Sequence, residues 1–134
     1  MEKDTGKNHH FRDLKCWQKG RELKIKLYQI AKSLPENEKY GLVSQIRRAA
    51  VSITANIAEG YGRFHYKENI QYCRQSRASV YECEDHLITC FDENYIDQQS
   101  YDEAISLMIE TRKVTDGYIR YLEKQLHKSD KRKK

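Results

Sequence analysis

The sequence predicts an all-α fold, a single antiparallel four-helix bundle with up-down-up-down topology over residues 1–134. The chain has one proline and six glycines in 134 residues, too few turn residues for a many-stranded sheet protein. Four segments carry apolar residues at helical spacing, separated by short breaks and without an internal repeat. A chain of this length can bury one core, so we expect one domain.

The first helix is expected over about residues 12–34, because Pro35 cannot donate to a continuing helix and disfavours helical backbone at the residue before it. Its bundle-facing row is Gly20, Leu23, Leu27, Ile30 and Leu34. The second helix is expected over about residues 38–62. Apolar residues recur there at spacings of four and three, and glycines at 60 and 62 indicate its C-terminus.

The third helix is expected over about residues 66–93 and the fourth over about 98–127, with Asp97 as its N-cap. Arg112 and Thr115 interrupt the apolar seam of the fourth helix. A buried arginine is costly unless it is paired, so Arg112 is expected to contact Glu84. The alternative is that Arg112 extends to solvent. Residues 128–134 are expected to form a disordered basic tail.

The net charge of +5 is unevenly distributed along the chain. Residues 11–34 carry +5 and residues 127–134 carry +4, whereas residues 64–126 carry −5. A surface polarised in this way suits a polyanionic partner. A solvated lysine face is the alternative explanation for the charges of the first helix.

The apolar residues of the first two helices cover a wider arc than one bundle can bury. Apolar surface beyond one core is typical of a subunit interface, so we expect a homo-oligomer. The alternative is a monomer whose N-terminal segment folds back over this face. The predicted interface residues are Leu14, Trp17, Ile25, Tyr28, Val51 and Ala55.

The sequence predicts no catalytic, cofactor or metal site. It lacks the nucleophile-elbow, phosphate-loop and dinucleotide fingerprints. Its four cysteines lie within helical patterns and are expected to be free thiols. Cys83, His86 and Cys90 share a helix face, but a structural zinc site needs a fourth ligand. We therefore expect a protein that is not an enzyme. Without a membrane-length apolar run or a signal peptide, it is expected in the cytoplasm.

The second helix also contains a long recognisable string, GLVSQIRRAAVSI at residues 41–53 followed by NIAEG at residues 56–60. With FRDLK at residues 11–15 and SVYE at residues 79–82, this string resembles the bacterial four-helix bundle family of ribosomal-RNA intervening-sequence proteins. The resemblance covers about residues 11–126. It implies a bundle often encoded within an insertion in the large-subunit ribosomal RNA gene. It also implies kinship with accessory variability proteins of diversity-generating retroelements, which form pentamers, bind nucleic acid and associate with a reverse transcriptase.

Charge pattern and resemblance together predict a homo-oligomer that binds RNA or DNA, with a pentamer and a reverse transcriptase partner implied by the resemblance alone. The alternative is a protein-interaction scaffold without nucleic-acid contact. The predicted nucleic-acid-binding residues are Arg12, Lys15, Lys19, Lys26, Arg63, Lys67, Lys128, Lys131 and Arg132. A polar stripe on the second helix is expected to be a structural network, with direct nucleic-acid contact as the alternative. Its members are Gln45, Arg48, Ser52, Asn56 and Glu59.

Overall fold

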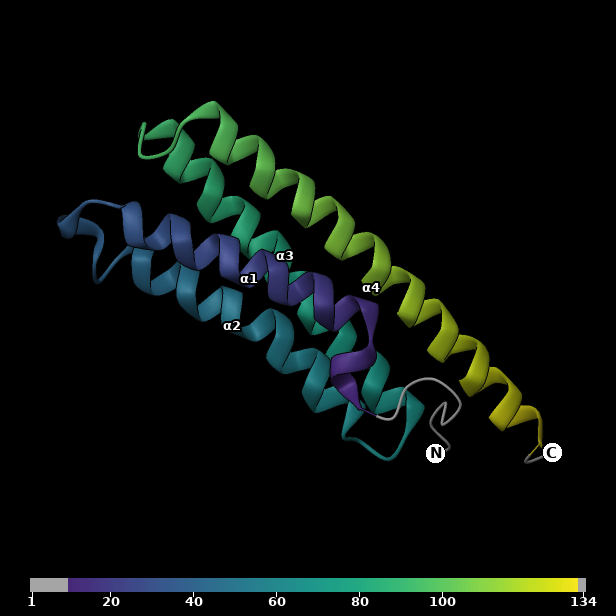
Figure 1. Cartoon of the computed structure of the whole chain (residues 1–134). Helices are drawn as coiled ribbons and strands as arrows, with labels where there is room; N and C mark the ends of the chain where they lie inside the picture. Colours follow the sequence, from purple (N-terminus) through teal and green to yellow (C-terminus); the bar gives the residue numbers. More distant parts are fainter. Residues whose placement is uncertain (1–9, 133–134) are drawn as a thin grey trace.

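The computed structural model describes residues 10–132, and within them it contains helices and no strand. The main helices are α1 (Lys15–Ser33), α2 (Leu42–Tyr61), α3 (Tyr66–Asp92) and α4 (Gln98–Arg132). They run alternately up and down, and each packs against two neighbours, so that α2 and α4 occupy diagonal corners (Figure 1). The predicted four-helix bundle is confirmed. No helix between residues 10 and 132 is both long and apolar enough to cross a membrane.

Two helices begin later than the sequence predicts. Phe11–Asp13 forms a short 3-10 helix, η1, and Leu14 has extended backbone, so α1 begins at Lys15 and Arg12 lies outside it. The ring nitrogen Nδ1 of His10 accepts a hydrogen bond from the backbone N–H of Arg12 at 3.2 Å, which caps η1. A second 3-10 turn, η2 (Glu36–Glu38), follows Pro35, and α2 therefore begins at residue 42 rather than 38.

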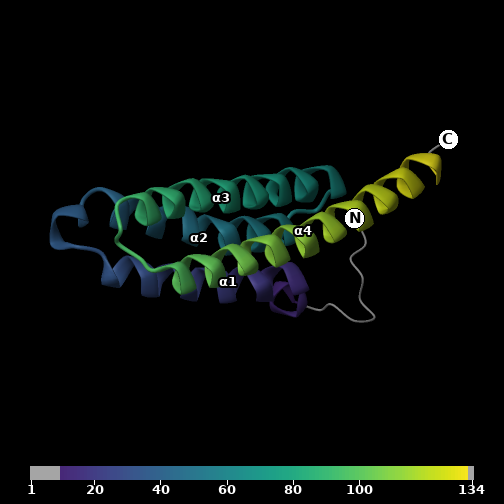
Figure 2. The same ribbon diagram turned by 90° about the horizontal axis from the view of Figure 1, so that it is seen from above.

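Helix α4 begins as predicted and ends later. Its N-cap is Asp97, whose Oδ1 accepts the backbone N–H of Ser100 at 2.8 Å, and this hydrogen bond lowers the pKa of the carboxyl. The helix continues to Arg132, and its last turns extend past the other helices (Figure 2). The expectation of disorder from residue 128 is therefore wrong for residues 128–132, while residues 133 and 134 lie outside the described part. No proline or glycine follows Gly117, and the terminal cations favour the helix dipole.

The buried apolar side chains form two clusters along the bundle axis. Between the two clusters lie buried hydroxyls on α2, α3 and α4. Ser76 Oγ donates to the carbonyl oxygen of Ile53 at 2.6 Å, and Thr115 Oγ1 donates to that of Thr111 at 2.7 Å. These hydrogen bonds satisfy the polar atoms, so the seam tolerates hydroxyl side chains at mid-height.

The arginine that interrupts the apolar seam of α4 has the partner that the sequence predicts. Arg112 Nη1 lies 2.8 Å from Glu84 Oε1, and the Arg112 side chain is 15 % exposed. Its guanidinium also lies 4.3 Å from the ring centroid of Tyr81. The contact between Arg112 and Glu84 is confirmed, and it sets the register of α4 against α3.

Candidate nucleic-acid interface

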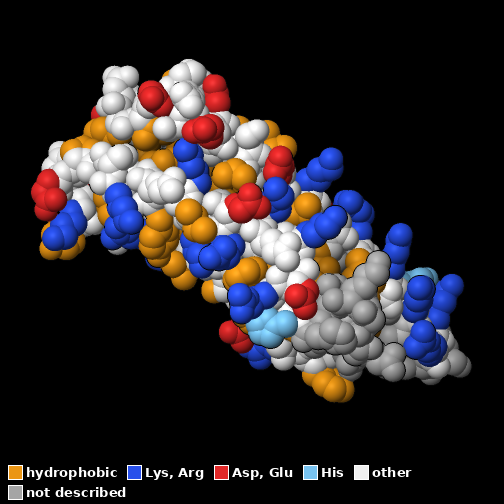
Figure 3. Space-filling view, in the orientation of Figure 1, with side chains coloured by type: hydrophobic (Ala, Val, Ile, Leu, Met, Phe, Trp, Pro, Cys, Tyr) orange, Lys and Arg blue, Asp and Glu red, His pale blue; other side chains and the backbone are white. Residues whose placement is uncertain are grey.

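At one end of the bundle α1 begins, α2 turns into α3, and α4 extends beyond the other helices (Figure 1). These segments carry six exposed basic side chains. None of them forms an ion pair with a carboxylate in the described part of the chain. We call this set the basic end, and its members are Arg12, Lys15, Lys67, Lys128, Lys131 and Arg132. Figure 3 shows Lys and Arg side chains around the C-terminal end of α4. Three nearby carboxylates, Asp13, Glu68 and Asp130, offset only part of the positive charge.

Two lysines that were expected to bind phosphate are paired within the chain instead. Lys19 Nζ lies 3.1 Å from Glu110 Oε2 and 3.4 Å from Glu22 Oε2, and hydrogen bonds to these carboxylates raise the pKa of Lys19. Lys26 Nζ lies 2.9 Å from Glu103 Oε1. Carboxylates of α4 therefore offset the charge of the α1 lysines, and this pairing removes Lys19 and Lys26 from the set of free cations.

Arg63 also has partners within the chain, at the turn between α2 and α3. Its Nη2 lies 3.0 Å from Glu59 Oε2 and donates to the hydroxyl of Tyr72 at 2.7 Å. The guanidinium lies 5.0 Å from the Tyr72 ring centroid. These contacts give Arg63 a structural position that joins the end of α2 to the start of α3.

The polar stripe of α2 contacts α3 at separate places rather than as one connected network. At one place Arg48 forms an ion pair with Glu82 of α3 and donates to Gln45 Oε1 at 3.0 Å. Glu82 Oε2 also lies 3.3 Å from His86 Nε2. Arg48 of α2 and Glu82 of α3 are thus paired across the surface of one chain.

A second place lies one and two turns further along α2. Ser52 Oγ and Ser79 Oγ are 2.9 Å apart, and Asn56 Nδ2 donates to the backbone oxygen of Ser52 at 2.8 Å. Glu59 contacts Arg63 at the α2–α3 turn. Every member of the predicted stripe therefore has a partner within its own chain.

Four of the predicted interface residues form a surface across α1 and α2, which we call the α1/α2 patch. Ile25 and Val51 are each 44 % exposed and, with Tyr28, line a depression of about 380 Å³. Ala55 is also exposed. The patch leaves apolar area on the surface of a single chain, as the sequence predicts for these four positions.

The other two predicted interface residues are directed toward the body of the bundle. Leu14 is only 4 % exposed and packs in the core cluster that contains Ile57, so its assignment to an interface is wrong. The physical reason is the extended backbone at Leu14, which turns the chain between η1 and α1. Trp17 is half-buried, packs against the same cluster, and has its ring centroid 5.6 Å from that of Phe11.

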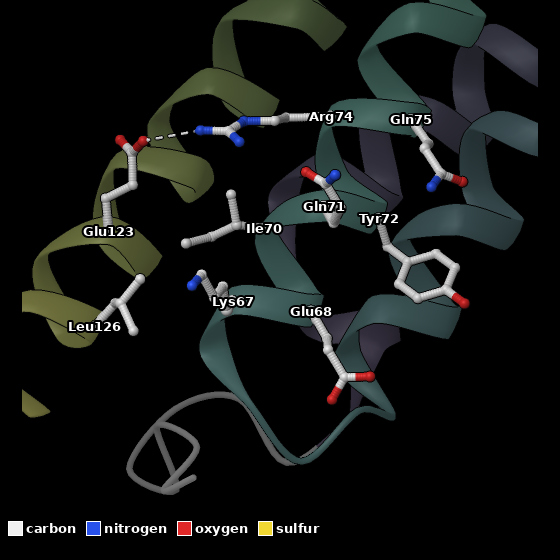
Figure 4. Close-up of a pocket in the computed structure, with 9 residues that line it drawn as sticks. All are labelled: Lys67, Glu68, Ile70, Gln71, Tyr72, Arg74, Gln75, Glu123 and Leu126. Carbon is white, nitrogen blue, oxygen red and sulfur yellow. Dashed lines mark hydrogen bonds and ion pairs between the residues drawn. The ribbon is translucent and has the colours of Figure 1, made fainter. Parts of the chain in front are cut away.

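A groove of about 770 Å³ opens between α3 and α4 beside the basic end (Figure 4). Ile70 and Leu126 provide apolar walls, and an ion pair of 3.4 Å between Arg74 Nη2 and Glu123 Oε2 crosses one side. Lys67 also lines the groove. The lining side chains include Glu68, Tyr72 and Glu123, but no serine, threonine, cysteine or histidine.

The four cysteines are buried, unpaired thiols. Burial raises the pKa of Cys16 and Cys83 to about 12 and that of Cys90 to about 11, and it also raises the pKa of Cys73. Within residues 10–132, no three His, Cys, Asp or Glu side chains are placed to hold a metal ion. These thiols are apolar core residues rather than nucleophiles.

We expect this burial to protect the thiols in the native state. Because a raised thiol pKa suppresses the reactive thiolate at pH 8, an aromatic disulfide reagent should modify fewer than one cysteine per folded chain within minutes. All four should react in urea. Rapid modification of a native thiol, followed by absorbance, would show that at least one helix opens readily.

Three further basic residues lie along the outer side of α4. Lys113, Arg120 and Lys124 are exposed or partly exposed and form no ion pair with a described carboxylate. They are missing from the set predicted from the sequence, although their spacing of seven and four places them on one helix face. Attention to charge opposite the apolar seam would have identified them.

The comparisons with known proteins agree with this architecture. The sequence model of the 23S rRNA-intervening sequence protein family matches residues 12–117. A solved structure with a similar fold is a protein of unknown function from the S23 ribosomal protein family of Bacteroides thetaiotaomicron VPI-5482. It shares 23 % sequence identity, covers 78 % of this chain and 97 % of its own, and superposes with a TM-score of 0.72. A comparison with curated proteins finds no match. Because the family match spans most of the bundle, the chain belongs to the 23S rRNA-intervening sequence protein family.

Proposed function

We propose that the protein is a non-catalytic nucleic-acid-binding bundle that works as a homo-oligomer. The observation that carries the proposal is the basic end, where six exposed cations have no carboxylate partner in the described chain. Cations presented in this way attract the phosphates of RNA or DNA and release condensed counterions on binding. The name of the family refers to a 23S rRNA intervening sequence, which makes RNA the first probe to test.

The opposite end of the bundle supports an oriented mode of binding. Carboxylates gather there around η2 and the α3–α4 turn, and Glu38 Oε2 accepts a hydrogen bond from the Tyr95 hydroxyl at 2.9 Å. These carboxylates repel phosphate, whereas the cations of the basic end attract it. A nucleic acid is therefore expected to approach along the bundle axis from the side where α4 extends.

The homo-oligomer is proposed from the α1/α2 patch. Its apolar side chains have no cover within residues 10–132, and exposed apolar surface of this kind is typical of subunit contacts. Five copies of the 16.0 kDa chain are proposed on the family resemblance. A reverse transcriptase partner is proposed on the same basis.

Removing charge at the basic end should weaken binding to a short RNA hairpin. For Lys128→Gln with Lys131→Gln, we expect an affinity loss of about tenfold at low salt and a salt slope shallower by about 2, because two phosphate contacts are lost. Fluorescence anisotropy of the labelled hairpin measures both.

The matched control for this variant is Arg21→Gln with Lys39→Gln, which removes two exposed cations elsewhere on the bundle. It should keep nearly the wild-type affinity. If both variants lose the same RNA affinity, the effect depends on net charge alone, which would contradict a localised site. Absence of RNA binding, together with a protein partner that survives nuclease treatment of a lysate, would replace the proposal with the scaffold alternative.

A further inference from the structure

The charge pairing of α4 is asymmetric. Its carboxylates face the neighbouring helices, where Asp116 Oδ1 lies 2.7 Å from Arg77 Nη1 and Glu123 Oε2 lies 3.4 Å from Arg74 Nη2. Glu103 and Glu110 likewise pair with lysines of α1. Carboxylates of α4 thus pair with two lysines of α1 and two arginines of α3, while its own outward cations remain without a carboxylate partner in the described chain.

These outward cations form one continuous row. Lys113, Arg120, Lys124, Lys128 and Lys131 follow each other at spacings of seven, four, four and three, which keeps them on one helix face. The row is roughly 27 Å long at 1.5 Å per residue. Figure 3 shows Lys and Arg side chains following the C-terminal half of α4 to its end. The helix dipole accounts only for cations in the last turn, and Lys113 and Arg120 lie well before it.

A glycine lies within this row and has no packing role. A Cβ built on Gly117 would meet only the guanidinium Nη2 of Arg120, at 3.8 Å. By contrast, a Cβ on Gly20 would lie 3.0 Å from Ile53 Cγ2, and one on Gly60 would lie 2.7 Å from Asn69 Oδ1. Glycine in a helix interior is unfavourable relative to alanine. Close helix contact explains the glycines at 20 and 60, whereas no neighbour in the described part of the chain requires a glycine at 117.

We infer that the outer face of α4 is a track for a nucleic-acid backbone, with phosphates held by Lys113, Arg120 and Lys124 and the backbone approaching most closely over Gly117. The inference rests on the proposed nucleic-acid binding and adds a site along the side of the bundle. The track continues from the basic end through Lys128 and Lys131. The track lies on the helix that is diagonal to α2, which carries Val51 and Ala55 of the α1/α2 patch.

The C-terminal part of this track lies outside the residues matched by the family, which end at 117. Arg120, Lys124 and the extended turns of α4 are therefore features of this chain beyond the matched range. Phosphate contacts made by such side chains position a nucleic acid without reading its sequence. We accordingly expect the track to bind hairpins of different sequence with similar affinity.

The test compares two pairs of substitutions with the same loss of charge, in the full chain and with the same labelled RNA hairpin. Arg120→Gln with Lys124→Gln should weaken binding by about tenfold and make the salt slope shallower by about 2. Arg21→Gln with Lys39→Gln should not. Arg120→Lys with Lys124→Arg should restore wild-type binding, since the charge is kept.

A separate variant tests the close approach. Gly117→Ala should raise Tm by about 2 to 5 °C, because alanine fits the helix and the added methyl group meets only a flexible side chain. The same variant should weaken RNA binding about threefold or more. A structural role for the glycine would instead lower Tm.

The outcomes separate this inference from the proposed function. If the wild-type chain binds RNA and Lys128→Gln with Lys131→Gln weakens it, but Arg120→Gln with Lys124→Gln behaves like the control, the track is overturned and the basic end remains. If Gly117→Ala binds as tightly as wild type, the close approach over the glycine is overturned. If the wild-type chain binds no RNA or DNA, the proposed function itself fails.

Discussion

Gly60→Ala is expected to lower the free energy of unfolding by about 1 to 3 kcal/mol. The added Cβ would lie 2.7 Å from Asn69 Oδ1 and 2.9 Å from Tyr72 Cβ, so α3 must shift away from α2. Overpacking of this kind costs about 1 to 3 kcal/mol, and a strained buried hydrogen bond costs about 1 kcal/mol more. The better helix propensity of alanine returns only about 1 kcal/mol.

The shift should also reach α4, because Asn69 links the two helices. Asn69 is 1 % exposed, its Nδ2 donates to the Tyr118 hydroxyl at 3.2 Å, and its Oδ1 accepts from Cys73 Sγ at 3.5 Å. Displacing Asn69 therefore disturbs the core cluster on the side of the basic end.

Urea unfolding at one fixed protein concentration measures the effect, since self-association would otherwise change the apparent stability. The matched control is Gly62→Ala. Its added Cβ would make only ordinary contacts, the nearest at 3.5 Å, and the backbone φ of −74° suits any residue. The control should change stability by less than about 0.5 kcal/mol. A Gly60→Ala protein as stable as wild type would contradict the close contact of α2 with α3.

Ile25→Glu with Val51→Glu is expected to convert the proposed oligomer to a monomer of 16.0 kDa. Both side chains are 44 % exposed in the single chain, so glutamate is tolerated there by the folded monomer. In a subunit interface, however, each carboxylate would lose its water, which costs several kcal/mol even beside Lys24 and Lys32. Light scattering coupled to size-exclusion chromatography gives the mass directly.

An isoleucine on α4 supplies the control for this variant. Ile109 is 55 % exposed, more than either patch residue, but lies on the helix diagonal to α2. Ile109→Glu should leave the oligomer mass unchanged. Dissociation by Ile109→Glu alone would place the interface on α4, and a monomeric wild-type protein would remove the need for an interface.

Most of the fold could be predicted from periodicity because each helix buries one continuous row. Gly20, Leu23, Leu27 and Ile30 are all buried as their spacing predicts. The partner of Arg112 could also be predicted, since an unpaired guanidinium in the seam is costly and α3 offers a carboxylate at the same height.

The candidate site was harder to predict because it depends on the register between helices. Lys19 and Lys26 share a stripe on α1, but only the packed bundle shows that α4 carboxylates reach them. The prediction that Leu14 faces outward is wrong for a local reason. Its extended backbone interrupts the helical spacing on which that prediction was based. The sequence places Lys124 opposite the apolar seam, but its lack of an ion pair depends on how the helices pack.

The central claim is that this bundle binds a nucleic-acid backbone through unpaired cations. Its most direct test is the salt dependence of binding between the wild-type chain and a short RNA hairpin. We predict that log K falls linearly with log salt concentration with a slope between about −3 and −6, as expected for several phosphate contacts. Absence of measurable binding at about 50 mM salt, or a slope near zero, would contradict it.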